Sequence, residues 1–282
     1  MLCPSCSKQN RDNAQFCSGC GQPLIDELLR QLDLCIVMDA TGSMKDYIEV
    51  TRKELKAFAQ KLYAHDIKPG IAYALVLYRD HPPSENSFVT QSYAFSENLE
   101  DLQKALDGAR AKGGGGDGAE AVVDGLYVAS HDLKWRENAH KVIVLVGDAP
   151  PHGWGSPKDR FPKGCPCEDE HGTVVDVAKN ARVRGISIFS LGIGDTVAMK
   201  KSFEEIAKHG GGHYVSISHA DTLIDEVLAV MGDEFGKVRI DRIVQSAYEP
   251  GSTPQSIAAV TSLKIGEVDE SMNRLRRRKL IN

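Results

Sequence analysis

The first residues that could carry chemistry follow an apolar run near the N-terminal end of the chain. The run 34–38 ends in Asp39, which is followed by Thr41 and Ser43. A carboxylate and two hydroxyls on one short loop are oxygen ligands of the kind that Mg²⁺ accepts. The same residues also suit a turn started by Asp39, with Thr41 or Ser43 capping a helix that begins at Met44. One loop alone does not separate these two readings.

A second apolar run ends in the same way. Residues 141–146 read as a buried strand and lead into Gly147, Asp148 and the sequence Ala-Pro-Pro-His-Gly. Ligands of parallel α/β sheets bind outside the carboxyl ends of the strands. Asp39 and Asp148 would therefore meet in one crevice if their strands lie close together. Two carboxylates there would repel each other unless a cation lay between them.

A glycine-rich stretch precedes a third acidic residue. Glycines 113–116 permit close backbone approach and unusual dihedral angles, and Asp117 follows them directly. Asp117 with Glu120 three residues later also fits the N-cap of a helix over 121–131. The capping role and a ligand role are compatible.

Cysteines give a separate signal at the N-terminal end. Cys3 with Cys6, and Cys17 with Cys20, form two Cys-x-x-Cys pairs within the first twenty residues. Two such turns complete a tetrahedral Cys₄ zinc site, and four protein ligands make its role structural. A redox pair is the alternative. The segment resembles the short zinc ribbons at the ends of many prokaryotic proteins.

A long loop after Asp148 holds further soft ligands. Cys165 and Cys167 lie within it, and His152 and His171 lie near its two ends. Cys-x-Cys is a less usual zinc spacing than Cys-x-x-Cys. These four residues are candidates for a second metal site or for stabilising the loop. The alternative, that they bind no metal, remains open.

Composition limits the class of protein. The chain has 282 residues, 41% of them hydrophobic and 26% charged, and a net charge of −5. This balance excludes a disordered chain and gives no overall drive toward nucleic acid. Apolar runs are too short for a membrane span, and the N-terminus has no secretory pattern. We expect a cytoplasmic protein without a membrane partner, whose seven cysteines bind metal or are buried.

Alternating helical and strand patterns predict an α/β fold with a doubly wound, mostly parallel sheet. Strands are expected at 71–78, 88–95, 141–146, 186–191 and 213–216, besides the one ending at Asp39. Helices are expected at 44–64, 99–111, 121–131, 174–184, 199–208 and 223–235. The predicted organisation is a zinc ribbon over 1–24, a linker helix over 25–31, the α/β domain over 32–235 and a helical tail over 236–282.

The tail suggests three short helices. The first covers 238–248, the second starts with Thr253 as cap and Pro254 at its first position, and the third lies near the C-terminal end. Such a set resembles a helix-turn-helix, so nucleic acid is one candidate partner. We favour a small protein-docking module. Arginines near the C-terminal end of a helix are also expected on an ordinary solvent-exposed face, because they interact favourably with the helix dipole. The candidate nucleic-acid contacts are Arg274, Arg276, Arg277 and Arg278.

Three motifs in order resemble the von Willebrand factor type A family over 32–235. They are Asp-x-Thr-Gly-Ser-Met from Asp39, Gly-Gly-Asp-x-x-Glu around Asp117, and Asp-Ala-Pro-Pro-His-Gly from Asp148. This combination is similar to the hemicentin and alpha-kinase-like subgroup. The family's metal-ion-dependent adhesion site uses an Asp-x-Ser-x-Ser pattern, a Thr in a glycine-rich loop and a later Asp. Here Thr41 replaces the first Ser, and Asp117 stands where adhesion members have Thr.

The resemblance implies a metal-bridged contact. Thr41 and Ser43 would bind Mg²⁺, or Mn²⁺ or Ca²⁺, directly, while Asp39 and Asp148 hold it mainly through waters. A Glu or Asp of a protein partner would complete the coordination. Direct coordination by Asp117 would tighten metal binding and weaken the attraction for an acidic ligand.

The expected function is therefore a non-catalytic protein-binding module. One alternative is a nucleic-acid-associated regulator that acts through the tail and the ribbon. Another is a metal-dependent hydrolase, for which His152 is the best candidate base. Phosphate-binding Gly-x-x-x-x-Gly-Lys-Ser/Thr and nucleophile Gly-x-Ser-x-Gly motifs are absent from the sequence.

Overall fold

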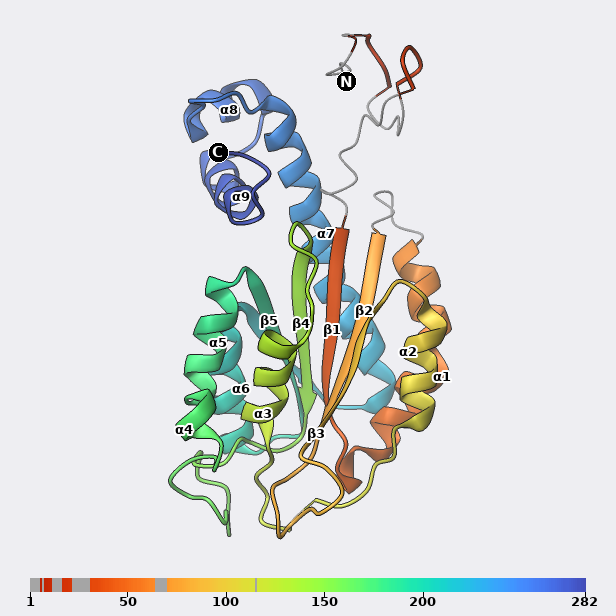
Figure 1. Ribbon diagram of the computed structural model, residues 1–282, viewed down its shortest axis with the longest axis vertical. Coiled ribbons are helices and arrows are strands. Elements are labelled where there is room, and N and C mark those ends of the chain that lie inside the picture. The colour runs from red at the N-terminus through yellow and green to blue at the C-terminus, as the bar shows by residue number, and fades with distance from the viewer. Residues whose placement is uncertain (1–5, 7, 12–16, 22–30, 64–69, 115) are drawn as a thin grey trace.

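The computed structural model describes residues 6, 8–11, 17–21, 31–63, 70–114 and 116–282 (Figure 1). Within these ranges, no helix has the length and apolar character needed to cross a lipid bilayer. The predicted linker helix at 25–31 lies outside them except for Gln31, which begins the first strand.

A six-stranded sheet has the order β3-β2-β1-β4-β5-β6. Neighbouring strands are parallel except for β2 and β3, which pair in antiparallel fashion. The chain builds one side of β1 first and then returns to build the other side from β4 onward. The predicted doubly wound, mostly parallel sheet is thus confirmed. The strands are β1 (Gln31–Asp39), β2 (Gly70–Tyr78), β3 (Thr90–Ser96), β4 (His140–Gly147), β5 (Ile186–Ile193) and β6 (Gly211–Ile217).

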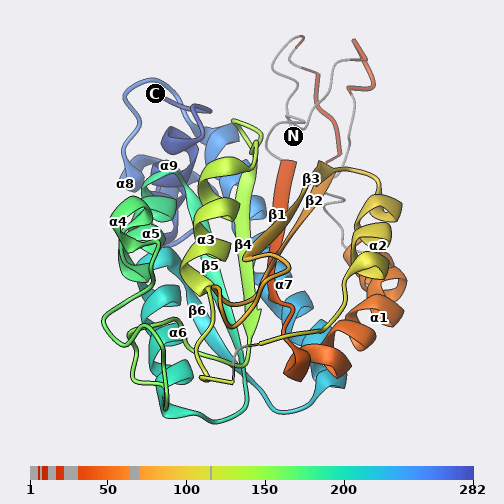
Figure 2. The same cartoon turned by 60° about the horizontal axis from the view of Figure 1, so that its bottom comes forward.

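Helices cover both faces of the sheet (Figures 1 and 2). Side chains of β1 alternate: Ile36 and Met38 face one core, and Cys35 and Val37 face the other. Since both faces are buried, the strand reads as a continuous apolar run. The first core is covered by α1 (Lys45–Tyr63), α2 (Leu99–Gly108) and α7 (Leu223–Ala247), and the second by α3 (Val122–Tyr127), α5 (Val174–Val183) and α6 (Val197–Gly210).

Three helices differ from the sequence-based expectation. α3 ends at Tyr127 and passes into a π-helical turn, Val128–Asp132, and a short α4 (Glu168–His171) interrupts the predicted loop. α7 runs unbroken to Ala247, so the predicted boundary at 235 lies inside one helix. Phe235, Val238 and Val244 are all buried along it, and this packing outweighs the low helix propensity of nearby glycines.

The tail folds back on the last turns of α7. α8 (Pro254–Thr261) and α9 (Ile265–Arg277) close a small core with that helix. Thr253 caps α8 by accepting a hydrogen bond from Ser256 N, with Pro254 at the first turn, as predicted. The core residues are Val244, Ile257, Val268, Met272 and Leu275.

Two of the tail arginines hold this packing together. Asp241 of α7 is fully buried and accepts hydrogen bonds from Arg274 (Nη2–Oδ1 2.6 Å) and Ser271 (2.7 Å). Arg278 Nη1 lies 3.4 Å from the other Asp241 oxygen, and its Nε donates to Asn138 O. The expectation of nucleic-acid contacts is therefore corrected for Arg274 and Arg278, whose charges are already paired.

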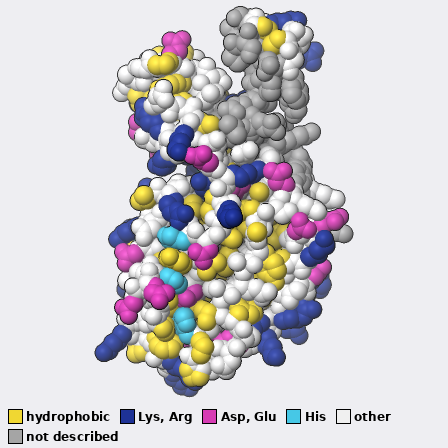
Figure 3. Space-filling view, viewed as in Figure 1, with side chains coloured by type: hydrophobic (Ala, Val, Ile, Leu, Met, Phe, Trp, Pro, Cys, Tyr) yellow, Lys and Arg dark blue, Asp and Glu magenta, His cyan; other side chains and the backbone are white. Residues whose placement is uncertain are grey.

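The other two arginines, Arg276 and Arg277, are exposed. Their contact with nucleic acid stays a prediction. On the face shown in Figure 3, Lys and Arg side chains are interspersed with Asp and Glu rather than gathered in one stripe. This face does not present the basic footprint that a nucleic-acid surface usually has.

A buried ion pair joins α7 to the sheet. Glu234 is fully buried and contacts His140 of β4 and Lys237, whose Nζ lies 2.5 Å from Glu234 Oε1. Burial by itself favours the neutral carboxyl group, but the charges and hydrogen bonds of His140 and Lys237 outweigh it. They hold the pKa of Glu234 at about 2.

Glu234→Gln is expected to destabilise the protein most above pH 4.5. Because folding lowers the pKa of Glu234, its ionised carboxylate stabilises the folded protein fully at pH values above the ordinary pKa of 4.5. This stabilisation is lost as the pH falls toward 2. We expect the variant to lose about 2–3 kcal/mol of unfolding free energy at pH 7, and this loss should shrink steadily at lower pH. Urea unfolding at pH 7, 4.5 and 3 measures it, with the exposed neighbour Asp233→Asn as control. A difference that stays constant across pH would contradict the assignment.

Candidate metal site

Strand register brings two acidic residues to the same edge of the sheet. β1 lies between β2 and β4, with Met38 opposite Val146. Asp39 is the last residue of β1, and Asp148 directly follows β4. The strands predicted to lie close together are therefore neighbours at the sheet's switch point, where ligands of such folds bind.

The loop after β1 presents its hydroxyls without using them as helix caps. Thr41 N donates to Asp39 Oδ1 (2.7 Å), and Thr41 Oγ1 lies 3.3 Å from Ser43 Oγ. Thr41 begins a short 3-10 turn, Gly42–Met44, but its side chain makes no capping hydrogen bond. The capping interpretation of this loop is wrong, and both hydroxyl groups stay available for a ligand.

The glycine-rich stretch packs directly on this loop. Gly42 N donates to Gly113 O (3.1 Å), and Gly114 has a φ of +96°. A Cβ at Gly114 would lie 3.1 Å from Thr41 Cβ, so the close approach favours glycine in both space and dihedral angle.

The two acids after the glycines have different positions. Glu120 lines the same hollow as Thr41, Ser43 and Asp148. Asp117 instead accepts from Arg160 N (3.0 Å) and lies in a group with His152 and Asp159. The expected capping role is also wrong, because the N-cap of α3 is Ala121 and no side chain caps it. The magnesium-ligand role of Asp117 stays a prediction, and Glu120 is a candidate that the proposed ligand set lacked.

The hollow has a volume of about 430 Å³. Ser43 is exposed and Asp148 is half-buried, so a partner's side chain can reach the oxygen atoms. The opposite wall comes from the loop after β4. The residues that line the hollow as a whole include Thr41, Gly42, Ser43, Gly113, Gly114, Glu120, Asp148, Ala149, Pro150, Ser156 and Pro157.

The acids in and beside this hollow hinder one another's ionisation. Burial, and then the charge of Asp148, raises the pKa of Asp39 to about 8. Burial, and then the charge of Asp39 with smaller contributions from other acids, raises the pKa of Glu120 to about 10. Asp39 Oδ2 and Glu120 Oε2 are buried without a hydrogen-bond partner. Converging carboxylates and hydroxyls with unpaired oxygens are a donor set that fits a hard divalent cation.

His152 does not join the two cysteines of its loop. It is buried, with Nε2 2.9 Å from Asp80 Oδ1 and Nδ1 2.8 Å from Asp159 Oδ1. Burial acts to lower the pKa of His152, but the hydrogen bonds and charges of Asp80 and Asp159 prevail and raise it. The predicted four-residue group of Cys165, Cys167, His152 and His171 is therefore corrected.

The cysteines lie with two residues that sequence reasoning missed. Cys165 and Cys167 surround Asp124 of α3 together with His81, which follows β2. His171 Nδ1 is 3.9 Å from Asp124 Oδ1. An acid inside the apolar run 121–126 and a histidine just past a buried strand were the available signals.

Three of the ribbon cysteines converge as predicted. Ligand atoms of Cys6, Cys17 and Cys20 lie within 4.8 Å of one another, while Cys3 lies outside the described residues. Hydrogen bonding from the Cys20 backbone is the largest influence on Cys17 and, with that from Gly19, lowers its pKa to about 6. A thiolate-favouring turn of this kind suits metal binding.

Residues 33–228 match the von Willebrand factor type A domain, and residues 2–24 match the zinc-ribbon domain. The first match covers more than half of the chain, which therefore belongs to the von Willebrand factor type A domain family. Such domains are generally protein-interaction modules, and the motif at Asp39, Thr41 and Ser43 is like the family's metal-ion-dependent adhesion site.

Two curated proteins are similar in sequence. Alpha-protein kinase vwkA of Dictyostelium discoideum is 31% identical over 137 residues, 48% of this chain and 21% of that protein. The putative ariadne-like RING finger protein R811 of Acanthamoeba polyphaga mimivirus is 32% identical over 130 residues, 46% of this chain and 12% of that protein. The match thus spans about a fifth or less of each relative.

Solved structures share the fold at low identity. BatB from Bacteroides thetaiotaomicron aligns with a TM-score of 0.50 and 14% identity, over 72% of this chain and 98% of that one. The pilus adhesin SpaC from Lactobacillus rhamnosus GG aligns with a TM-score of 0.54 and 16% identity, over 72% of this chain and 30% of that one. At these identities the likeness concerns the fold alone.

Proposed function

We propose that this chain is a non-catalytic module that binds a protein partner through a Mg²⁺ ion in the hollow at the end of β1 and β4. The ion would contact an Asp or Glu side chain of the partner. The observation that carries the proposal is the open hollow itself, where two hydroxyls meet the carboxylate of Asp148 and the unpaired Oε2 of Glu120. The unpaired Oδ2 of Asp39 is buried at the start of the same loop.

Charge decides how well such a site attracts an acidic partner. Thr41 and Ser43 are neutral donors, so coordination by them leaves positive charge on the ion. Asp39 and Asp148 would position it, as the family's pattern implies. Glu120, neutral in the metal-free hollow at neutral pH because of its raised pKa, would add one more negative charge if a bound cation ionised it. We therefore expect firm metal binding and a moderate affinity for the partner's carboxylate.

The arrangement of His152 supports a non-catalytic role. Both of its ring nitrogens are within hydrogen-bond distance of aspartates, Asp80 and Asp159, and the ring is buried. A general base needs a nitrogen that can reach the proton it removes. His152 instead serves to tie the loop after β4 to the end of β2.

Peptide display can test the proposal. The full chain is panned in Mg²⁺ against random peptides, and enriched peptides are compared with matched Glu→Gln and Asp→Asn versions. We expect an acidic residue in the enriched peptides and at least tenfold weaker binding after its replacement, in EDTA, or with Asp39→Asn. Glu54→Gln, on the exposed side of α1, should bind as the wild type does. Equal binding in Mg²⁺ and EDTA would overturn the metal-bridged contact.

A further inference from the structure

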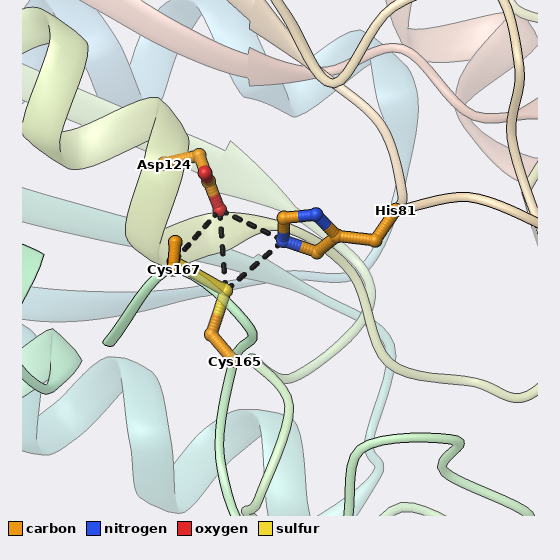
Figure 4. A group of neighbouring side chains, drawn as sticks. All are labelled: His81, Asp124, Cys165 and Cys167. Atoms are coloured by element: carbon orange, nitrogen blue, oxygen red, sulfur yellow. Dashed lines mark hydrogen bonds and ion pairs between the residues drawn. A yellow bond between two sulfur atoms is a disulfide. The ribbon is translucent and has the colours of Figure 1, made fainter. Parts of the chain in front are cut away.

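We propose a second metal site, for Zn²⁺, formed by His81, Asp124, Cys165 and Cys167 (Figure 4). It is separate from the hollow at Asp39 and from the N-terminal ribbon. Nitrogen, oxygen and sulfur ligands in a set of four match tetrahedral structural zinc.

The four ligand atoms lie within 4.8 Å of one another. His81 Nε2 lies 3.0 Å from Asp124 Oδ2 and 3.0 Å from Cys165 Sγ. Asp124 Oδ2 also lies 3.2 Å from Cys165 Sγ and 3.1 Å from Cys167 Sγ. One carboxylate oxygen is therefore approached by a nitrogen and two sulfurs at once, from two other segments of the chain. Figure 4 shows all four side chains pointing inward.

Burial makes a cation favourable at this point. The side chains of His81 and Asp124 are each 11% exposed, Cys165 is buried and Cys167 is half-buried. A buried carboxylate next to two thiolates would be strongly unfavourable without compensating positive charge. Zn²⁺ supplies that charge and accepts all four donor atoms.

His171 supports the site without being a ligand. Its Nδ1 lies 3.9 Å from the outer oxygen of Asp124, and its ring stacks on Tyr127 with centroids 3.8 Å apart. Residues placed behind a ligand in this way orient it toward the metal. We therefore assign His171 a positioning role.

The two sulfurs are joined as a disulfide in the structure, so the site has an oxidised form and a reduced form. A thiol reductant supplies two electrons and two protons, becomes a disulfide itself, and leaves two thiols at Cys165 and Cys167. Binding of Zn²⁺ then displaces the two thiol protons to water. Only the reduced form offers two thiolate ligands.

The site would fasten one wall of the hollow at Asp39. His81 follows β2, Asp124 lies on α3, and the cysteines lie on the loop between β4 and α5. That same loop carries Ser156, which donates to Gly118 O at 2.5 Å and lines the hollow. Zinc at the cysteines would hold this loop against β2 and α3, and so keep the wall in place.

Zinc content of the full chain tests the proposal. Protein purified under a phosphine reductant and treated with metal-free buffer should contain two zinc ions per chain by mass spectrometry. A ribbon variant, Cys6→Ser/Cys17→Ser/Cys20→Ser, should retain one, and Cys165→Ser/Cys167→Ser should also retain one. One zinc in the wild type, or two in Cys165→Ser/Cys167→Ser, would overturn the site.

Titration of the ribbon variant with Co²⁺ keeps the test independent of misfolding. The visible spectrum should show tetrahedral cobalt with sulfur charge transfer, and His81→Asn should weaken Co²⁺ binding at least tenfold. His171→Asn should keep the tetrahedral spectrum with weaker binding. An octahedral cobalt spectrum without sulfur charge transfer in the folded ribbon variant would refute the ligand set.

Discussion

Replacing Asp39 by asparagine is expected to abolish stabilisation by Mg²⁺ while leaving the metal-free protein at least as stable as the wild type. In the metal-free folded protein, burial and repulsion from Asp148 raise the pKa of Asp39 to about 8, so at neutral pH folding must force a proton onto a group that is ionised when unfolded, and this opposes folding. Asparagine removes this repulsion and keeps the oxygen that accepts from Thr41 N. The same change deletes a charge on which the cation depends.

The size of this effect follows from linkage. Mg²⁺ at a hundred times its dissociation constant stabilises a folded protein by about 2.7 kcal/mol, and we expect this whole increment to vanish in the variant. Thermal unfolding with Mg²⁺ and with EDTA measures it as a shift of roughly 5–10 °C in the wild type. Glu54→Gln is the control and should keep the shift. An undiminished shift in Asp39→Asn would place the magnesium elsewhere.

Asp241→Ala is expected to cost about 3–5 kcal/mol, because it leaves two arginines without their buried counter-ion. Asp241 is fully buried, and the side chains of Arg274 and Arg278 are 13% and 7% exposed. The change should loosen α9 from α7 and expose the small tail core.

Urea unfolding measures the loss, and tryptic cleavage after Arg276 and Arg277 should become faster. Asp269→Ala, an exposed acid on α9, is the control and should change stability by less than about 0.5 kcal/mol. A loss below about 1 kcal/mol for Asp241→Ala would mean that the arginine network is not what holds the tail.

The sheet was predictable because its central strands are buried on both faces. Residues 34–38 and 142–146 read as unbroken apolar runs; Asp39 follows the first directly, and Asp148 follows the second after one glycine. The end of the α/β domain was not predictable in this way. Gly232 and Gly236 suggest a break in local sequence, whereas packing of Phe235 and Val238 on either side of Gly236 carries α7 through.

The candidate sites were predictable only in part. Asp39 and Asp148 follow from strand ends, but the placing of Glu120 in the hollow and of Asp117 beside His152 depends on the turns of a glycine-rich loop. His81 and Asp124 lie 43 positions apart, and Cys165 lies 41 positions beyond Asp124. Their meeting is a consequence of tertiary packing that no local spacing encodes.

The most direct measurement of the central claim is the position of bound Mn²⁺, a substitute for Mg²⁺, by anomalous diffraction from crystals of the full chain. We predict a peak in the hollow within bonding distance of Thr41 Oγ1 and Ser43 Oγ, and beside Asp39, Asp148 and Glu120. The peak should be missing from crystals of Asp39→Asn. A wild-type hollow without manganese at saturating Mn²⁺, or a peak that persists in Asp39→Asn, would contradict the account.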